Sequence, residues 1–303
     1  MTFDVKPLPG GIGVEVVGLE IDHSIAPATA SALRDLWLEA GIVLFRRIGT
    51  TPDALLHLSR CFGELEVHPI KHFRLEGYPE LIILTNENGP VGPVYEFDGV
   101  PIYGRIPWHT DLAYMSTPNA GALLRMVQKT ATGGQTGWLD TAAAYDALDQ
   151  STKQRIGPLE AEYRFTATLS DMRFNNPGGV RLGPTRTDYP HFPPVANPLV
   201  WTHPETGRKV LNVSTLNIRS ILGLDPAKGD ALIRELIAHA LQPRFQYIHE
   251  WENNDLMLWD NRRTMHCAFG HPMEQIRIVQ RSTIRGTVTM GRVIEERAEA
   301  QPT

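Results

Sequence analysis

The chain has 303 residues, of which 42% are hydrophobic and 21% are charged, and its formal net charge is −5. This composition is typical of a soluble globular protein, and a chain of this length can bury a sizeable core without disulfide bonds. Because lysine and arginine are scattered rather than clustered, we expect no nucleic-acid partner, and because every apolar run is short, we expect no membrane-spanning helix.

Two helices are predicted near the start of the chain. Apolar residues recur at helical spacing over 27–40, and Gly41 follows in the position where glycine commonly ends a helix. The pair Thr51-Pro52 is typical of an N-cap followed by proline in the first turn, which predicts a second helix over 52–62. Between the two helices, the apolar run at 42–45 predicts a buried strand.

The rest of the chain is predicted to be mostly strands. The further elements are, in chain order, a strand at 81–84, an irregular segment at 86–106, strands at 120–127 and 137–139, helices at 141–148 and 152–156, an irregular segment at 175–198, a strand at 210–213, a helix at 225–241, and strands at 245–251, 256–259 and 276–284. The irregular insertions, around 86–106 and 170–200, are candidate lid segments, and the sequence leaves open whether they act as lids. This order predicts a single domain over 1–303, mainly β with helical insertions (α+β), built as a β-sandwich or jelly roll.

One short motif points to a metal site. His109 and Asp111 are separated by Thr110, and in extended backbone two residues at this spacing point to the same side. With a second histidine from a distant strand, they would form the face of two histidines and one carboxylate that is typical of non-haem Fe(II) oxygenases. The motif also fits a surface turn in which the aspartate caps a local amide, so by itself it leaves both interpretations open.

The sequence around His266 favours the metal interpretation. Arg277 follows His266 by eleven residues and falls on the next predicted strand. A guanidinium group can grip a carboxylate with two parallel hydrogen bonds. A histidine and an arginine at this spacing would therefore place a metal ligand and a carboxylate-binding group in one pocket.

Several segments together resemble the taurine dioxygenase / 2,4-dichlorophenoxyacetate dioxygenase (TauD/TfdA) family of Fe(II)- and 2-oxoglutarate-dependent dioxygenases. They stand in the family's order and at family-like spacing, and the resemblance covers about 8–286. In chain order the segments are Trp108 to Asp111, Thr132 to Thr136, Ala142 to Leu148, Thr202 to Lys209, and Trp259 to Arg262 leading to His266, Arg277 and Arg281.

The resemblance implies a double-stranded β-helix, or jelly roll, with an iron centre. Iron would be bound by His109, Asp111 and His266, and the carboxylate of 2-oxoglutarate by Thr136 and Arg277. The resemblance further implies that Fe(II), 2-oxoglutarate and O2 act together to hydroxylate a C–H bond, with succinate and CO2 as products. No catalytic residue is expected beyond the metal and cosubstrate ligands.

Four residues are candidates for binding the substrate. Arg281 lies four residues after Arg277 and would point the same way on a strand, and the taurine-oxidising branch of the family holds the substrate anion at this position. His68 matches a family position that touches that anion. Arg105 stands where the taurine branch has a neutral amide, and Tyr103 would line the same pocket mouth. Together they predict a small anionic substrate, such as a sulfonate, an aryloxyalkanoate or a modified amino acid, and they argue against taurine itself.

Other residues near these motifs are expected to have supporting roles. We expect Trp108 and Trp259 to shield the metal from water, and Asn261 either to orient a ligand or to shape a turn. His203 is expected to belong to a loop, and His271 is not expected to reach the pocket.

Two other functions stay open on the sequence. A metal-dependent hydrolase or isomerase on a cupin-like barrel would work without O2 and would not need Arg277. A non-catalytic binding barrel would keep the pocket and lose the chemistry. The two cysteines, Cys61 and Cys267, form no disulfide framework, and the N-terminus shows no signal peptide, so we expect a cytoplasmic protein. The family resemblance further predicts a homodimer or tetramer.

Overall fold

The computed structural model describes residues 3–21, 25–48, 51–68, 71–89, 92–183 and 189–295. Within these residues the fold is mainly β with few helices. The α-helices are α1 (Pro27–Ala40), α2 (Pro52–Arg60), α3 (Thr141–Asp146), α4 (Gln150–Ile156) and α5 (Pro226–Ala240), and the short 3-10 helices are η1 (Pro9–Gly11), η2 (Lys71–Phe73), η3 (Leu169–Asp171) and η4 (Pro243–Phe245). None of the helices that the structure describes is long and apolar enough to cross a membrane.

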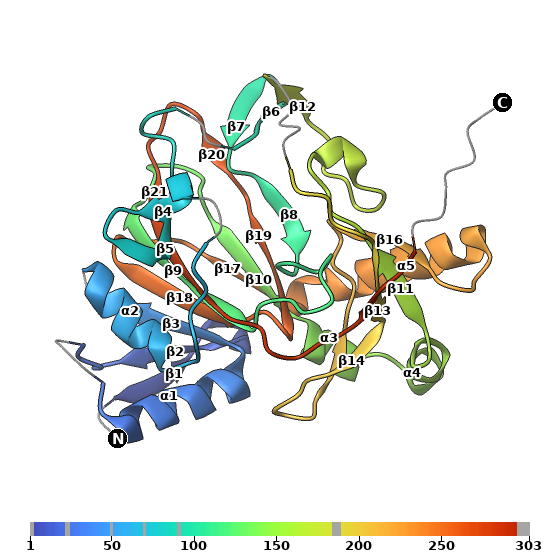
Figure 1. Cartoon of the computed structure of the whole chain (residues 1–303), viewed down its shortest axis with the longest axis horizontal. Helices are drawn as coiled ribbons and strands as arrows, with labels where there is room; N and C mark the ends of the chain where they lie inside the picture. The colour runs from blue at the N-terminus through green and yellow to red at the C-terminus, as the bar shows by residue number, and fades with distance from the viewer. Residues whose placement is uncertain are drawn as a thin grey trace.

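The largest sheet has eight strands (Figure 1). In spatial order they are β1 (Asp4–Pro7), β2 (Val14–Val17), β3 (Ile42–Arg46), β18 (Asp255–Asp260), β9 (Gly121–Gln128), β21 (Ile278–Ile284), β5 (Tyr78–Thr85) and β4 (Arg74–Leu75). Strands β2 and β3 run parallel, and the other neighbours in this sheet are antiparallel.

Four smaller sheets complete the described fold. The sheet that matters most for the site has the order β17 (Gln246–His249), β10 (Thr136–Asp140), β19 (Thr264–Ala268) and β8 (Ile106–His109). The others are β16 (Ile218–Ile221), β11 (Glu160–Tyr163), β13 (Val195–Pro198) and β22 (Arg292–Val293); β12 (Val180–Leu182), β6 (Val94–Phe97), β7 (Val100–Tyr103) and β20 (His271–Pro272); and β14 (Val200–Thr202) with β15 (Lys209–Leu211).

Both faces of the central strands of the eight-stranded sheet are buried. Val43 and Leu123 point to the face covered by α1 and α2. Their neighbours Leu44 and Leu124 point to the opposite face, where they pack with Trp138 of the β17-β10-β19-β8 sheet. Side chains alternate between the two faces of a strand, so a strand covered on both sides reads as a continuous apolar run. This explains why the run at 42–45 was recognisable from the sequence as a buried strand.

The prediction of an irregular segment at 86–106 was wrong over 94–103, which form a β-hairpin, and at 106, where β8 begins; residues 90 and 91 lie outside the described part of the chain. Phe97 at the end of β6 pairs with Val100 at the start of β7. The two residues between them, Asp98 and Gly99, both have positive φ, 51° and 77°. Aspartate followed by glycine favours this kind of two-residue hairpin turn. The Asp98-Gly99 pair was visible in the sequence, but the glycines and prolines around it led to the prediction of an irregular segment.

The second expected irregular insertion, around 170–200, is partly structured. It contains η3 and the short strands β12 and β13, and residues 184–188 lie outside the described part of the chain. Strand β19 was also missed, because almost all of its residues are buried and no alternation marks it in the sequence. The predicted helices at 27–40 and 225–241 are confirmed within one residue at each end.

Buried charges fix the loop between β18 and β19, which carries the chain to His266. Asp260 is fully buried, and both of its oxygens accept hydrogen bonds from Arg262 at 2.9 Å. The Nδ1 of His203 accepts backbone N–H groups, so its Nε2 donates to Asp260 at 2.9 Å. Burial raises the pKa of Asp260, but the hydrogen bond from His203 and the charge of Arg262 outweigh burial and lower the pKa to about 2. His203 thus lies in a loop, the one after β14, as predicted, and its ring supports the separate loop between β18 and β19.

We expect Asp260→Ala to reduce the free energy of unfolding by about 3–5 kcal/mol, because it leaves Arg262 and His203 without their buried partner. Urea unfolding at pH 7 measures the change. Asp146→Ala removes an exposed ion pair with Arg208 and should cost less than about 1 kcal/mol. The folded pKa of Asp260 lies below its usual 3.8, so its contribution is present above pH 4 and is lost as the pH falls towards 2. Equal losses for the two variants would contradict this role.

Candidate active site

Two histidines face each other across neighbouring strands. His109 ends β8 and His266 lies in β19, and the antiparallel register pairs them directly. Residues paired in this way point to the same face of a sheet, and the ring centroids of the two imidazoles are 4.2 Å apart. Trp138 of β10 pairs with His266 on the other side. The register therefore places both imidazoles on the face of the β17-β10-β19-β8 sheet that points towards the eight-stranded sheet.

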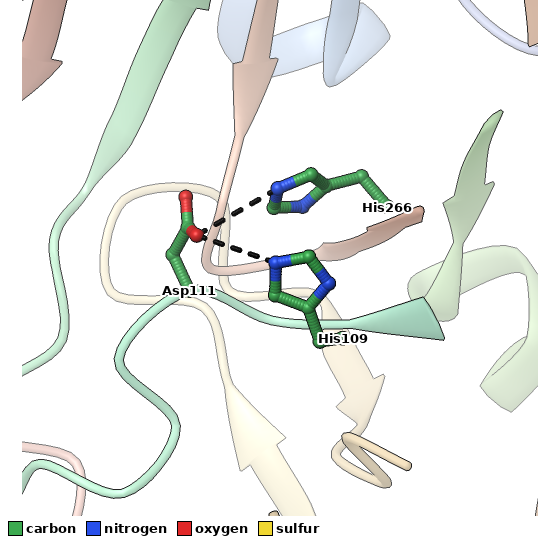
Figure 2. Close-up of side chains that lie close together, drawn as sticks. All are labelled: His109, Asp111 and His266. Carbon is green, nitrogen blue, oxygen red and sulfur yellow. Dashed lines mark ion pairs between the residues drawn. The ribbon is translucent and has the colours of Figure 1, made fainter. Parts of the chain in front are cut away.

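Asp111 reaches the same point from the turn after β8. Its Oδ1 lies 3.5 Å from Nε2 of His109 and 3.7 Å from Nε2 of His266, as Figure 2 shows. One possible ligand atom from each of the three residues falls within 4.8 Å of the other two. Asn261 holds the Asp111 backbone from both sides, since its Oδ1 accepts from the N–H at 2.9 Å and its Nδ2 donates to the carbonyl at 3.0 Å. These bonds hold the backbone of the turn that carries Asp111, so both roles expected for Asn261 fit the geometry.

The charge states of this cluster suit a divalent metal. Burial raises the pKa of Asp111, but the charge of Arg281 and the nearby histidines outweigh burial and hold the pKa well below its usual range. Burial and the neighbouring His109 lower the pKa of His266 well below its ordinary value. The site therefore offers a carboxylate and a neutral imidazole at neutral pH, which are the protonation states that metal ligands need.

The cluster lies in the wall of a cavity of about 310 Å³ between the two sheets. Arg277 lies just before β21 and lines this cavity, as does Thr136, the first residue of β10. Burial lowers the pKa of Arg277 to about 10, so it stays protonated at neutral pH. Its guanidinium makes no hydrogen bond within the described chain, and its backbone N–H is held by Asn86 at 3.0 Å. A buried cation without a partner is costly, which fits a site built for an anionic ligand.

Thr136 is oriented by a tryptophan. The indole N–H of Trp251 donates to the hydroxyl oxygen of Thr136 at 3.0 Å. Because that oxygen already accepts a hydrogen bond, its own proton is available to a group in the cavity. Thr136 and Arg277 thus both offer donors to the same space.

The structure brings three of the four substrate-site candidates to the cavity. Arg281, Arg105 and Tyr103 line it. Arg281 contacts Oδ2 of Asp111 and lies 5.2 Å from the ring centroid of Trp259. His68 does not line the cavity; its ring packs edge-on against Phe73, which does.

Several lining residues were not recognised from the sequence. His271 was expected to stay outside the pocket, but it lines the cavity, is buried and packs edge-on against Tyr103 at 5.5 Å. Gly134 also lines the cavity, and its φ of +78° and the 2.6 Å that would separate a Cβ from Thr130 Oγ1 both favour glycine at this position. The glycine turn in the sequence was the signal for this close approach.

The tryptophans next to the motifs differ in position. Trp259 lines the cavity and packs on His266, with ring centroids 4.9 Å apart. Trp108 points away from the cavity and packs with the apolar cluster formed around α5. The expected shielding position next to the cluster is therefore occupied by Trp259 and not by Trp108.

Comparison with known proteins adds a family match over most of the chain. The model for the family described as "Taurine catabolism dioxygenase TauD, TfdA family" matches residues 4–283. An (S)-phenoxypropionate/alpha-ketoglutarate-dioxygenase from Sphingobium herbicidovorans is 33% identical over 94% of this chain and 95% of its own length. An alpha-ketoglutarate-dependent 2,4-dichlorophenoxyacetate dioxygenase from a Burkholderia species is 29% identical over 90% and 91%.

Solved structures show the same fold. A taurine dioxygenase from Burkholderia xenovorans superposes with a TM-score of 0.77 at 28% identity, covering 99% of this chain and 96% of its own. The crystal structure of AAD-2 in complex with Mn(II) and N-oxalylglycine superposes with a TM-score of 0.75 at 28% identity, covering 96% and 100%.

Proposed function

Because this chain belongs to the taurine catabolism dioxygenase TauD/TfdA family, we propose that its cavity oxidises a small organic anion with Fe(II), 2-oxoglutarate and O2. The protein is a 2-oxoglutarate-dependent dioxygenase, and its relatives are named for the same activity. Bound in the cavity, Fe(II) and 2-oxoglutarate would supply, with O2, the oxidising chemistry that hydroxylates a C–H bond and gives succinate and CO2. The observation that carries the proposal is the convergence on one cavity of two histidines, one carboxylate and an arginine that has no carboxylate partner among the described residues.

We assign the metal to His109, Asp111 and His266. Two imidazoles and one carboxylate match the donor set of non-haem Fe(II) oxygenases, which leaves further coordination positions for ligands other than the protein. Arg281 and Asn261 would hold Asp111 in place, one through its carboxylate and the other through its backbone. In this assignment, the protein orients one carboxylate and two imidazole rings towards the metal.

We assign the distal carboxylate of 2-oxoglutarate to Arg277 and Thr136. The arginine provides a fork of N–H donors, and Trp251 leaves the Thr136 proton free to point into the cavity. The low exposure of these groups strengthens each interaction, since water competes less for the carboxylate. Asn86 supports the arginine by holding its backbone.

The substrate is proposed to be an organic acid with an apolar body. Relatives are named for (S)-phenoxypropionate, 2,4-dichlorophenoxyacetate and sulfate esters. Here the cavity combines Arg105 and Arg281 with a largely apolar lining that includes Leu84, Leu124 and Val279. Tyr103 would contact the substrate directly, and His68 would act through Phe73.

We also propose that the eight-stranded sheet and the β17-β10-β19-β8 sheet form the two sides of a double-stranded β-helix within a single domain. The cavity between the sheets, lined by strands of both, supports this assignment. The hairpin β6–β7 would close one side of the cavity, since Tyr103 lines it, in place of the irregular candidate lid there. The expected dimer or tetramer and the cytoplasmic location stay predictions.

The visible spectrum of the anaerobic protein tests the function. Chelation of 2-oxoglutarate to bound Fe(II) should give a weak charge-transfer band, and consumption of 2-oxoglutarate on admitting O2 should yield succinate. Omission of either iron or the keto acid should abolish the band. A protein that demonstrably binds Fe(II) but shows no band with 2-oxoglutarate would overturn the proposed function.

Asn261→Ala is expected to weaken Fe(II) binding by about 10- to 100-fold, because the carboxylate of Asp111 loses the clamp on its backbone. Anaerobic metal titration measures the affinity. Asn253→Ala is the matched control, since Asn253 accepts from the Lys129 backbone at 2.8 Å on the exposed surface. An unchanged affinity in Asn261→Ala would limit Asn261 to shaping the turn.

A further inference from the structure

The two donors assigned to the distal carboxylate of 2-oxoglutarate come from different sheets. Thr136 opens β10 in the β17-β10-β19-β8 sheet, and Arg277 lies just before β21 in the eight-stranded sheet. The two strands are far apart along the chain, as their colours in Figure 1 show, and they are not hydrogen-bonded neighbours. Pairing between strands therefore does not set the distance between these donors, and the segments that precede them have to do so.

One side chain joins these two segments. Gln275 lies two residues before Arg277. Its Oε1 accepts hydrogen bonds from the backbone N–H groups of Ala131 at 2.8 Å and Thr132 at 3.1 Å. Its Nε2 donates to the hydroxyl oxygen of Thr132 at 2.7 Å. Three of the four hydrogen bonds that one amide can make thus bind the turn that leads into Thr136.

A second amide fixes the segment that carries Arg277. Asn86 is buried just after β5, and its Oδ1 accepts from the N–H of Arg277 at 3.0 Å. Its Nδ2 donates to the carbonyl groups of Met273 at 3.1 Å and Gln275 at 2.9 Å. The backbone of Gln275 is therefore held in place, and its side chain carries the position of this segment over to the turn before Thr136.

The turn that Gln275 holds needs support from outside. Gly133 and Gly134 both have positive φ, 72° and 78°, and glycine loses more conformational freedom than any other residue when it is ordered. The far side of the turn is held by Thr130, whose hydroxyl donates to the Gly133 carbonyl at 3.1 Å, and by a backbone bond from Gly134 to Gly270. Gln275 supplies the side-chain support on its near side, at 131 and 132.

We propose that Gln275 is a positioning residue that sets the distance between Thr136 and Arg277 and thereby selects a five-carbon keto diacid. This rests on the proposed function. The keto-acid end is fixed at the metal, so the distal carboxylate meets both donors only when the carbon chain between its two ends has the right length. A keto diacid with one more methylene, such as 2-oxoadipate, then loses part of this grip, because small misplacements weaken an oriented contact strongly.

Titration of keto acids into the anaerobic Fe(II)-loaded protein, followed by the charge-transfer band, tests this role. Gln275→Ala should weaken 2-oxoglutarate binding by roughly 10-fold, because the two donors lose their fixed spacing. It should leave Fe(II) binding and the weak binding of pyruvate unchanged, since both depend on the metal end. The ratio of the dissociation constants of 2-oxoadipate and 2-oxoglutarate should fall, because a relaxed site discriminates less between the two lengths.

Other variants separate positioning from general stability. Thr132→Val removes the acceptor of Gln275 Nε2 and should show part of the loss, and Thr132→Ser, which retains the hydroxyl, should restore it. Gln246→Ala is the matched control and should bind 2-oxoglutarate like the wild type, because Gln246 also donates to a backbone carbonyl, that of Leu241 at 2.6 Å, but does not line the cavity.

The effect of Gln275 should depend on Thr136. In Thr136→Val, only Arg277 remains as a donor, so adding Gln275→Ala should weaken 2-oxoglutarate by clearly less than 10-fold. Equal losses in both backgrounds, equal weakening of pyruvate and 2-oxoglutarate, or unchanged 2-oxoglutarate binding in Gln275→Ala would each overturn the role of Gln275. The band of the wild type with saturating 2-oxoglutarate reports the proposed function by itself, so a failure of that function is recognised separately.

Discussion

Replacing Arg277 by leucine is expected to weaken 2-oxoglutarate binding by about 100-fold or more. The variant removes a buried guanidinium that has no protein partner among the described residues, so the whole effect should fall on the ligand. Losing one member of a buried, hydrogen-bonded charge pair commonly costs about 2–5 kcal/mol of binding energy. The affinity is measured by titrating 2-oxoglutarate into the anaerobic Fe(II)-loaded protein and following the charge-transfer band.

Two controls show whether the loss concerns the distal carboxylate. Pyruvate chelates iron through the same keto-acid end but lacks that carboxylate, so wild type and Arg277→Leu should bind it equally weakly. Arg285→Leu removes an exposed arginine paired with Glu64 and should leave 2-oxoglutarate binding unchanged. If Arg277→Leu weakened pyruvate as much as 2-oxoglutarate, Arg277 would act on the metal end and its assigned role would be wrong.

The same variant should keep or raise the stability of the ligand-free protein. Burial disfavours the charged form of Arg277, as its lowered pKa of about 10 shows, and no carboxylate of the described chain offsets that cost. The uncharged side chain of leucine would remove that cost. A higher melting temperature with weaker 2-oxoglutarate binding would show that this position trades stability for function.

His266→Ala is expected to abolish the charge-transfer band and turnover at micromolar Fe(II). His266 is paired with His109 by strand register and lies 3.7 Å from Asp111, so its loss leaves two of the three converging ligands. The fall in metal affinity should exceed the roughly 10- to 100-fold that is typical of losing an outer-shell partner. Anaerobic Fe(II) titration, followed by the band with 2-oxoglutarate, measures both effects.

Imidazole and a second histidine distinguish a ligand role from a packing role. Added imidazole should partly restore the band in His266→Ala, because it can occupy the space left by the ring. His271→Ala removes another buried histidine that lines the cavity but is no part of the converging group, and it should retain Fe(II). Loss of Fe(II) in both variants, with both proteins folded by circular dichroism, would contradict the assigned ligand set.

The sequence by itself determined the elements and residue types that follow from local chemistry. Apolar spacing before Gly41 set the end of α1, and Thr51 with Pro52 set the start of α2, since capping depends on neighbours along the chain. The spacing of His109 and Asp111 gave the metal hypothesis, and the motifs leading to Arg277 gave the family, which the comparisons confirm.

Only the tertiary structure decided how these residues meet. The pairing of His109 with His266 depends on the register of β8 and β19, which are far apart in sequence. The same holds for the contact of Arg281 with Asp111 and for the arrival of His271 at the cavity, since both depend on which strands become neighbours. Local patterns fix the conformation of a segment, whereas the partner of a charged side chain is set by long-range packing. For this reason, the sequence identified Arg105, Arg277 and Arg281 as candidates, and the fold shows that, within the described residues, only Arg281 among them contacts a carboxylate.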